Sequence, residues 1–99
     1  MSLAVDSLAQ SRRRERVTKL YLQFAQNGLS LRDKELAEFS FETGASEEKA
    51  TSYYRILLAS GRLIEHIENG MMWTGTPSAW DAAEKETAMK KNRSLDEHS

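Results

Sequence analysis

Residues 46–75 read SEEKATSYYRILLASGRLIEHIENGMMWTG, and this stretch decides the fold. Ser46 followed by Glu47 and Glu48 is typical of a helix start, because a serine hydroxyl caps free backbone N–H groups and the helix dipole favours negative charge there. Apolar residues then recur at helical spacing, as Ala50, Tyr53, Tyr54, Leu57 and Leu58. We therefore predict a helix from Ser46 to the glycine at position 61.

The second half of the stretch predicts a β-hairpin. Asn69-Gly70 is the preferred pair for a two-residue hairpin turn, since both residues adopt positive φ readily. Such a turn fixes the register of the two strands, and we expect His66 to lie opposite Trp73 as a half-exposed pair. Leu63 should mark the face of the hairpin that packs on the core.

Two helices are predicted before this stretch. Val17, Leu20, Tyr21, Phe24 and Ala25 form an apolar stripe, which predicts a first helix over about 12–26. A second helix should begin at a Ser30 cap and end at Thr43-Gly44. Its inner face is expected to hold Leu36, Ala37, Ser40 and Phe41, with Phe39 at the margin.

The remaining segments lie at the two ends of the 99-residue chain. Residues 1–11 are expected to be a flexible or helical lead, and 12–76 the folded domain. A polar C-terminal helix is expected over 77–91, capped by Ser78, with a disordered tail at 92–99. The predicted class is therefore α+β, mostly α: three helices and a hairpin, followed by one more helix.

Charge is distributed unevenly along the chain. The formal net charge is −1, but residues 12–19 contain five basic residues and one acidic residue, which gives a local charge of +4. This segment is either a solvated helix start or a surface that faces nucleic acid. Its basic residues are Arg12, Arg13, Arg14, Arg16 and Lys19.

Signatures of catalysis and metal binding are not found in the sequence. There is no cysteine, and there are two histidines, His66 and His98. Glu65 and His66 are neighbours on a predicted strand and should point to opposite faces, which argues against a metal cluster. We predict neither an enzyme nor a cofactor or metal site. The N-terminus does not resemble a signal peptide and no run is long enough to span a membrane, so we expect a cytoplasmic protein.

The order of helix, helix, short turn, helix and hairpin across 12–75 resembles the winged helix-turn-helix superfamily. The pattern Leu57-x-x-x-Gly61-x-Leu63 before a hairpin is similar to the same junction in many such domains. In DNA-binding members the third helix enters the major groove and the hairpin, or wing, touches the DNA backbone or the minor groove. The resemblance therefore implies a double-stranded DNA partner and the groove-facing residues Lys49, Thr51, Ser52, Arg55 and Arg62.

Two functions follow from this resemblance. The first is a small DNA-binding protein, such as a transcription regulator or a plasmid or phage accessory factor, whose basic 12–19 segment holds the backbone. A homodimer, with its seam at the first or last helix, would double these contacts. The alternative is a protein-interaction module, because the hairpin tip has no Lys or Arg. Its partner would contact the wing at Ile64, Met71 and Trp73.

Overall fold

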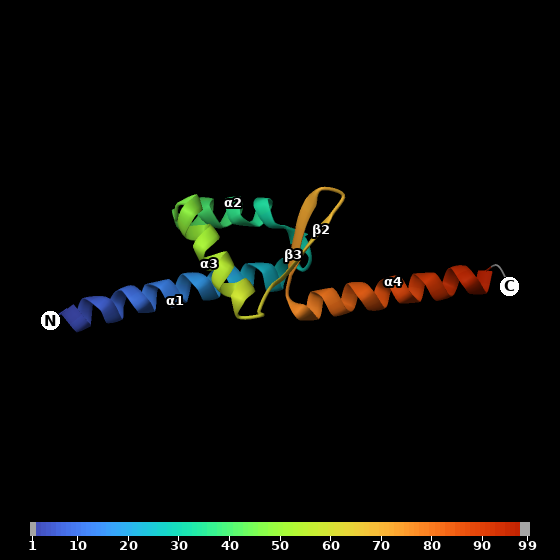
Figure 1. Ribbon diagram of the computed structural model, residues 1–99, viewed down its shortest axis with the longest axis horizontal. Helices are drawn as coiled ribbons and strands as arrows, with labels where there is room; N and C mark the ends of the chain where they lie inside the picture. The colour runs from blue at the N-terminus through green and yellow to red at the C-terminus, as the bar shows by residue number, and fades with distance from the viewer. Residues whose placement is uncertain (1, 98–99) are drawn as a thin grey trace.

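A computed structural model of the protein describes the backbone of residues 2–97 and the side chains of residues 10–87. The architecture is α+β and mostly helical, with four helices and one three-stranded antiparallel sheet in the described part (Figure 1). In chain order the elements are α1 (Ser2–Asn27), β1 (Ser30–Leu31), α2 (Arg32–Thr43), α3 (Glu47–Ala59), β2 (Ile64–Glu68), β3 (Met71–Gly75) and α4 (Pro77–Glu97).

The core lies where α1, α2 and α3 meet. Phe24 of α1 packs against Tyr54 with ring centroids 6.0 Å apart, and Phe39 of α2 meets Tyr53 edge-on at 6.1 Å. Such tilted and edge-to-face pairs are favoured by the ring quadrupole. The rest of the buried apolar cluster consists of Leu20, Ala45, Ala50, Leu57 and Leu63. The stripes predicted for α1 and α3 are thus confirmed in their central residues.

The predicted inner face of α2 is confirmed at Leu36, which packs against the core, and is wrong at Ala37 and Phe41. Phe39 is fully buried, whereas Phe41 is 90% exposed and Ala37 is also exposed. The cause is Glu35, which is 3% exposed and occupies an inner position. Its Oε2 accepts hydrogen bonds from Gln23 Nε2 at 2.6 Å and from Asn27 Nδ2 at 3.0 Å. Two amides of α1 therefore satisfy a buried carboxylate and turn the face of α2 that carries Phe39 inward.

The boundaries of α3 follow from local signals. Ser46 accepts a hydrogen bond from the Lys49 backbone N–H at its start, as predicted. At its end Gly61 has a φ of +76°, and the backbone N–H groups of Gly61 and Arg62 donate to the carbonyls of Leu58 and Leu57. This pair of bonds is a Schellman motif, in which glycine adopts the left-handed conformation that reverses the chain into β2.

The sheet confirms the predicted register and adds a strand. His66 pairs with Trp73 and Glu68 with Met71 across the two-residue turn. The strand that was not predicted is β1, in which Ser30 pairs with Thr74 of β3. Ser30 is therefore a strand residue, and the prediction that it caps α2 is wrong. The residue before α2 is Leu31, which makes no side-chain cap.

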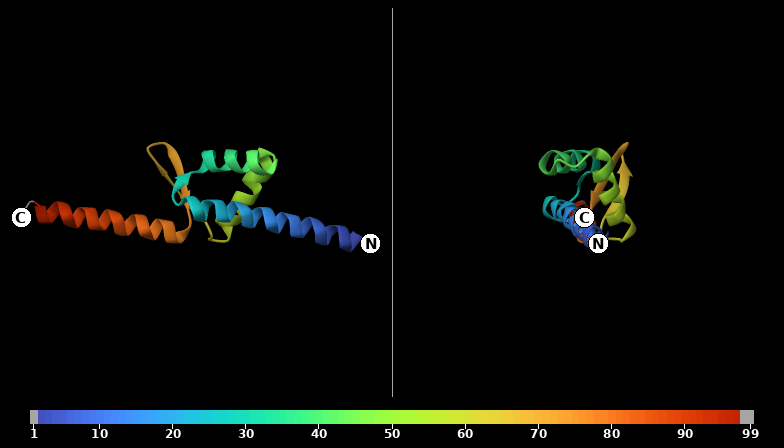
Figure 2. Two further views of the ribbon diagram at one scale, coloured as in Figure 1. Left: turned by 180° about the vertical axis from the view of Figure 1, so that it is seen from behind. Right: turned by 90° about the vertical axis from the view of Figure 1, so that its left-hand side faces the viewer.

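The C-terminal helix begins earlier than its predicted cap and extends further. Thr76 Oγ1 accepts a hydrogen bond from the Ala79 N–H, so Thr76, and not Ser78, caps α4. The helix continues to Glu97 where a tail had been predicted from 92, and α1 likewise begins at Ser2. Residues 98–99 lie outside the described part. As Figure 2 shows, α1 and α4 leave the core in opposite directions, giving a molecule of 73 × 22 × 19 Å.

Candidate nucleic-acid interface

The outer face of α3 is polar and open to solvent. Lys49, Ser52 and Arg55 are exposed, and Thr51 is half-buried. All four were predicted to face a ligand, and their spacing places them away from the buried stripe of Ala50, Tyr53, Tyr54 and Leu57. The acids of α3, Glu47 and Glu48, lie in its first turn beside Lys49, so Arg55 is the one charged side chain on the rest of the helix.

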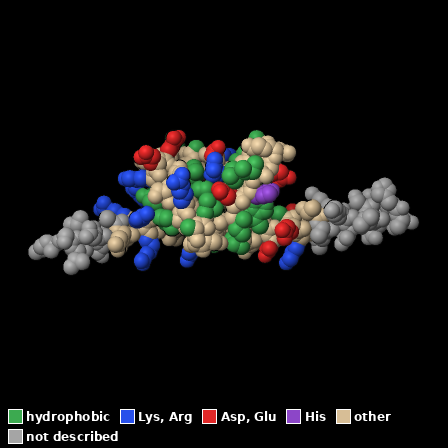
Figure 3. Space-filling view, viewed as in Figure 1, with side chains coloured by type: hydrophobic (Ala, Val, Ile, Leu, Met, Phe, Trp, Pro, Cys, Tyr) green, Lys and Arg blue, Asp and Glu red, His purple; other side chains and the backbone are tan. Residues whose placement is uncertain are grey.

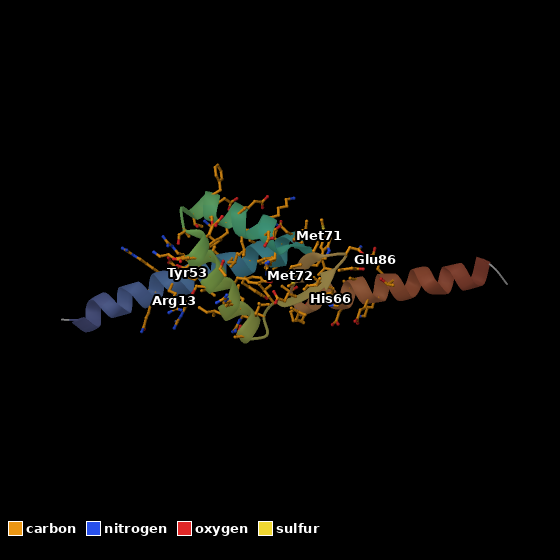
Figure 4. The ribbon with its side chains drawn as sticks, turned by 45° about the horizontal axis from the view of Figure 1, so that its top comes forward. Arg13, Tyr53, His66, Met71, Met72 and Glu86 are labelled. Carbon is orange, nitrogen blue, oxygen red and sulfur yellow. The ribbon has the colours of Figure 1, made fainter. Side chains whose placement is uncertain are left out.

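A cleft of about 590 Å³ runs along one flank of α3, between its C-terminal end and α1. Arg13 and Arg14 of α1 reach it from one side, and Arg62, which follows α3, reaches it from the other. Arg13 is drawn on the part of α1 that emerges beside α3 (Figure 4). The remaining lining residues are Gln10, Val17, Thr18, Tyr21, Ile56, Leu57 and Ser60. Three arginines from two distant parts of the sequence thus share one cleft that no acidic side chain lines.

The opposite flank of α3 carries a second hollow, of about 360 Å³, that is lined by Arg55 and Arg32. Arg32 was missed by sequence analysis. It is the first residue of α2, and its Nε donates to Asp33 at 3.0 Å, the one ion pair among the described side chains. Glu65 also lines this hollow. Its two positive charges are therefore balanced by two negative charges, unlike those of the cleft at α1.

The basic segment 12–19 is split by the geometry of α1. Helical spacing places Arg14 and Val17, which line the cleft, on one side of Arg13, and turns Arg12, Arg16 and Lys19 by about 60–120° to its other side. Lys19 lines a separate hollow with Arg14, on the side of α1 that carries the exposed Leu22. The structure thus brings two of the five predicted basic residues, Arg13 and Arg14, to the cleft beside α3.

A partly buried chain of hydrogen bonds joins α3 to the hairpin. Tyr54 Oη lies 2.5 Å from Glu65 Oε2 of β2 and 2.7 Å from Thr74 Oγ1 of β3. Because the tyrosine has one hydroxyl proton and donates it to the carboxylate, the Thr74 hydroxyl must donate to the tyrosine oxygen. Burial, reinforced by the hydrogen bond to Glu65, raises the pKa of Tyr54 well above its ordinary value of 10.0. Tyr54 therefore remains a neutral donor at any physiological pH.

The hairpin presents apolar side chains on both faces. Ile64, Ile67 and Met71 are 45%, 61% and 52% exposed. Trp73, the third residue predicted for a protein partner, is half-buried beside Leu31 of β1. Figure 4 shows Met71 and Met72 on the hairpin, above the start of α4. Ile67 was not among the residues predicted to contact a partner, because the alternation of side chains along the strand placed it on the core-facing side of the hairpin.

The ring of His66 also has an aromatic neighbour that the sequence did not predict. His66 is opposite Trp73 in register, but its recorded ring contact is with Trp80 of α4, edge-on at 6.1 Å. Trp80 Nε1 in turn donates to the Ile64 carbonyl at 2.8 Å. The exposed face of the hairpin base is therefore covered in part by the first turn of α4, which attaches α4 to β2.

Charge is distributed unevenly on the face that bears α3 and the hairpin. Figure 3 shows Lys and Arg gathered over α1 and the neighbouring part of α3, and Asp and Glu both over the α2–α3 turn and, together with the histidine, toward the hairpin and α4. In the sequence the hairpin runs from Leu63 to Gly75 with two glutamates and no Lys or Arg. A polyanion would therefore be attracted to the basic side chains of α1 and repelled by the hairpin tip.

Comparison of the chain with models of protein families, with curated proteins and with solved structures finds no match. Among the described residues, no group of three or more His, Asp and Glu side chains is placed to hold a metal ion. Within the same part of the chain, every helix is too short or too polar to cross a membrane.

Proposed function

We propose that this chain is a winged-helix protein that binds double-stranded DNA, with α3 as the recognition helix. The order α1, β1, α2, α3 and hairpin, with a three-residue turn before α3, is compatible with that fold. A cytoplasmic transcription regulator, or a plasmid or phage accessory factor, is the class that this activity fits.

The observation that carries the proposal is the grouping of Arg13, Arg14 and Arg62 beside the exposed face of α3. Phosphate contacts supply most of the sequence-independent affinity of DNA-binding proteins, and arginine makes them with two donors at once. The three side chains are exposed, and none makes an ion pair with another described residue. They are therefore available to phosphate oxygens without first breaking an internal contact.

The dimensions of α3 suit a major groove. Its 13 residues span about 20 Å, and a B-DNA major groove of about 12 Å width admits one helix. With α3 in the groove, the Arg13, Arg14 and Arg62 cleft would face one phosphate strand, and Arg32 with Arg55 would lie toward the other. Arg55 has the fork geometry for a bidentate guanine contact, and Thr51 and Ser52 supply shorter donors and acceptors.

The test is DNA affinity as a function of salt. Fluorescence anisotropy with a labelled mixed-sequence duplex should show binding at low salt that weakens steeply as salt rises. Each phosphate neutralised should contribute about 0.9 to the slope of log affinity against log salt concentration. Light scattering on the same samples gives the mass, and a homodimer would double the number of contacts. Absence of binding to the duplex at low salt would exclude the proposal.

A second candidate is a protein-interaction module that uses the hairpin. The observation in its favour is the exposure of Ile64, Ile67 and Met71 on a hairpin that has no Lys or Arg. Replacement of Ile64 and Met71 by serine should then abolish capture of a partner while leaving DNA binding intact. Phe41→Ser is the control, since it removes an apolar side chain that is still more exposed, and does so on α2, away from the hairpin.

A further inference from the structure

We propose that the cleft between α1 and the end of α3 is a binding site for an organic anion with an apolar body, such as a medium-chain carboxylate. The site is separate from the outer face of α3 that is proposed to read DNA, which carries Lys49, Thr51, Ser52 and Arg55. It combines a hydrophobic floor with a rim of three cations, and both parts are needed to define the ligand class.

The floor of the cleft is apolar and preformed. Leu57 is 2% exposed, and Val17, Tyr21 and Ile56 are half-buried around it. These side chains come from the packed interface of α1 and α3, so their positions are set by the core. The cleft volume of about 590 Å³ lies in the range of small-molecule sites, about 300–1,000 Å³. A short alkyl chain or an aromatic ring would displace water from this floor.

The rim of the cleft is cationic. Arg13, Arg14 and Arg62 line it, and no Asp or Glu is among its lining residues. The C-terminal end of a helix normally repels an anion, because its last carbonyls are free. Here two of those carbonyls are occupied: Leu57 accepts from Arg62 N–H and from Ser60 Oγ, and Leu58 accepts from Gly61 N–H. The capping of α3 thus weakens the local repulsion and leaves the arginines as the dominant charges.

The test is the binding of octanoate to the full chain, which is measured by titration calorimetry and by methyl NMR. Octanoate should bind and shift the signals of Val17, Ile56 and Leu57, and hexanoate should bind more weakly, since each buried methylene raises affinity by a factor of about four. Octylammonium, which has the same chain and the opposite charge, should not shift these signals. Equal binding of the two head groups, or shifts confined to the hairpin or Phe41, would overturn the assignment.

Charge variants separate the cleft from the rest of the surface. Replacing both Arg14 and Arg62 by Gln should lower the octanoate affinity at least tenfold, while the thermal melt stays unchanged because both side chains are exposed. Lys34→Gln removes one positive charge from α2, outside the cleft, and should leave octanoate binding unaltered. Loss of binding in the Lys34 variant would show that net charge, and not this cleft, holds the anion.

The competing occupant is a helix from a second copy of the chain. Light scattering would then give a dimer, and octanoate binding would weaken as protein concentration rises, which would overturn the assignment to a small anion. The inference does not depend on DNA binding, because octanoate is added to the free protein. If both proposals hold, octanoate should also weaken duplex binding more than acetate does at equal ionic strength, because the same arginines are engaged.

Discussion

The hydroxyl of Tyr54 lies 2.5 Å from a carboxylate oxygen of Glu65, and this contact joins the middle of α3 to the first strand of the hairpin. Thr74 completes the chain from the neighbouring strand at 2.7 Å. Tyr54 is 3% exposed and Thr74 is fully buried. The orientation of the hairpin relative to α3 is therefore set by two polar contacts, of which the one to Thr74 is buried and the one to Glu65 is partly buried. A buried hydrogen bond is costly to leave unmade.

Tyr54→Phe should reduce the free energy of unfolding by about 1–3 kcal/mol, because it leaves the buried Thr74 hydroxyl and the Glu65 carboxylate without their partner. Urea denaturation monitored by circular dichroism measures the difference. Tyr21→Phe is the matched control: Tyr21 is half-buried and lacks a side-chain hydrogen bond among the described residues, so its loss should stay within about 0.5 kcal/mol. Equal losses in the two variants would contradict the role given to Tyr54.

The raised pKa of Tyr54 predicts a stability that falls in alkali. The unfolded chain loses the tyrosine proton near its ordinary pKa of 10.0, whereas the folded chain retains it to higher pH. The contribution of Tyr54 is therefore complete below pH 10 and is lost as the pH rises above it. Between pH 8.5 and pH 11 the wild type should lose more stability than Tyr54→Phe in paired urea titrations. Parallel curves for the two proteins would show that Tyr54 ionises alike in both states.

Phe39 and Phe41 provide a test of the orientation of α2. Phe39→Ala should cost about 3–5 kcal/mol, because it removes a fully buried ring and leaves a cavity beside Tyr53. Phe41→Ala makes the same chemical change two residues away, where the ring is 90% exposed, and should change stability by less than about 0.5 kcal/mol. Thermal melts of the two variants measure both values, and the opposite ranking would restore the face predicted from sequence.

Trp80→Phe should loosen α4 without unfolding the core. The substitution removes the Nε1 hydrogen bond to the Ile64 carbonyl and keeps most of the apolar area. Hydrogen exchange should speed up in the first turns of α4 and remain slow in α3. Trp73→Phe is the control, since the structure records no hydrogen bond for its indole N–H. Uniformly faster exchange in the Trp80 variant would indicate global destabilisation instead.

Substitutions on the outer face of α3 and substitutions in the cleft should affect DNA binding differently. Replacing both Arg14 and Arg62 by Gln should weaken binding to all duplexes and lower the salt slope by about two, because two phosphate contacts are lost. Arg55→Ala should instead reduce the preference for a selected sequence over mixed sequence, by about 1–3 kcal/mol. Lys85→Gln on α4 controls for net charge. Identical effects of the Arg55 variant and the cleft variant would contradict the assignment of α3 as the reader.

Features with local causes could be predicted from the sequence. The Ser46 cap, the glycine that ends α3 and the Asn69-Gly70 turn each act within a few residues, and the structure has all three. The inner face of α2 could not be predicted, because a glutamate is ordinarily placed outside. Glu35 is inside only because Gln23 and Asn27, on another helix, supply its donors.

The candidate site was predictable in part for the same reason. The polar face of α3 follows from helical spacing, so Lys49, Thr51, Ser52 and Arg55 were identified from sequence and are at or near the surface. The meeting of Arg13 and Arg14 with Arg62 depends on the crossing of α1 and α3, which no local pattern encodes. Arg32 was missed because its position depends on β1, and that two-residue strand forms only through pairing with β3.

The junction from Gly75 to Trp80 determines the direction in which the long helix α4 leaves the core. A Cβ at Gly75 would lie 2.6 Å from Leu29 Cδ2 and 3.3 Å from the Ala79 Cβ, so the glycine allows β3, α4 and the segment before β1 to approach closely. The 21 residues of α4 extend for about 31 Å beyond this point. A change of about 10° in its tilt at Gly75 would move the far end by about 5 Å. Packing within a few ångströms of Gly75 thus determines the position of the far end of α4, at a distance from the core.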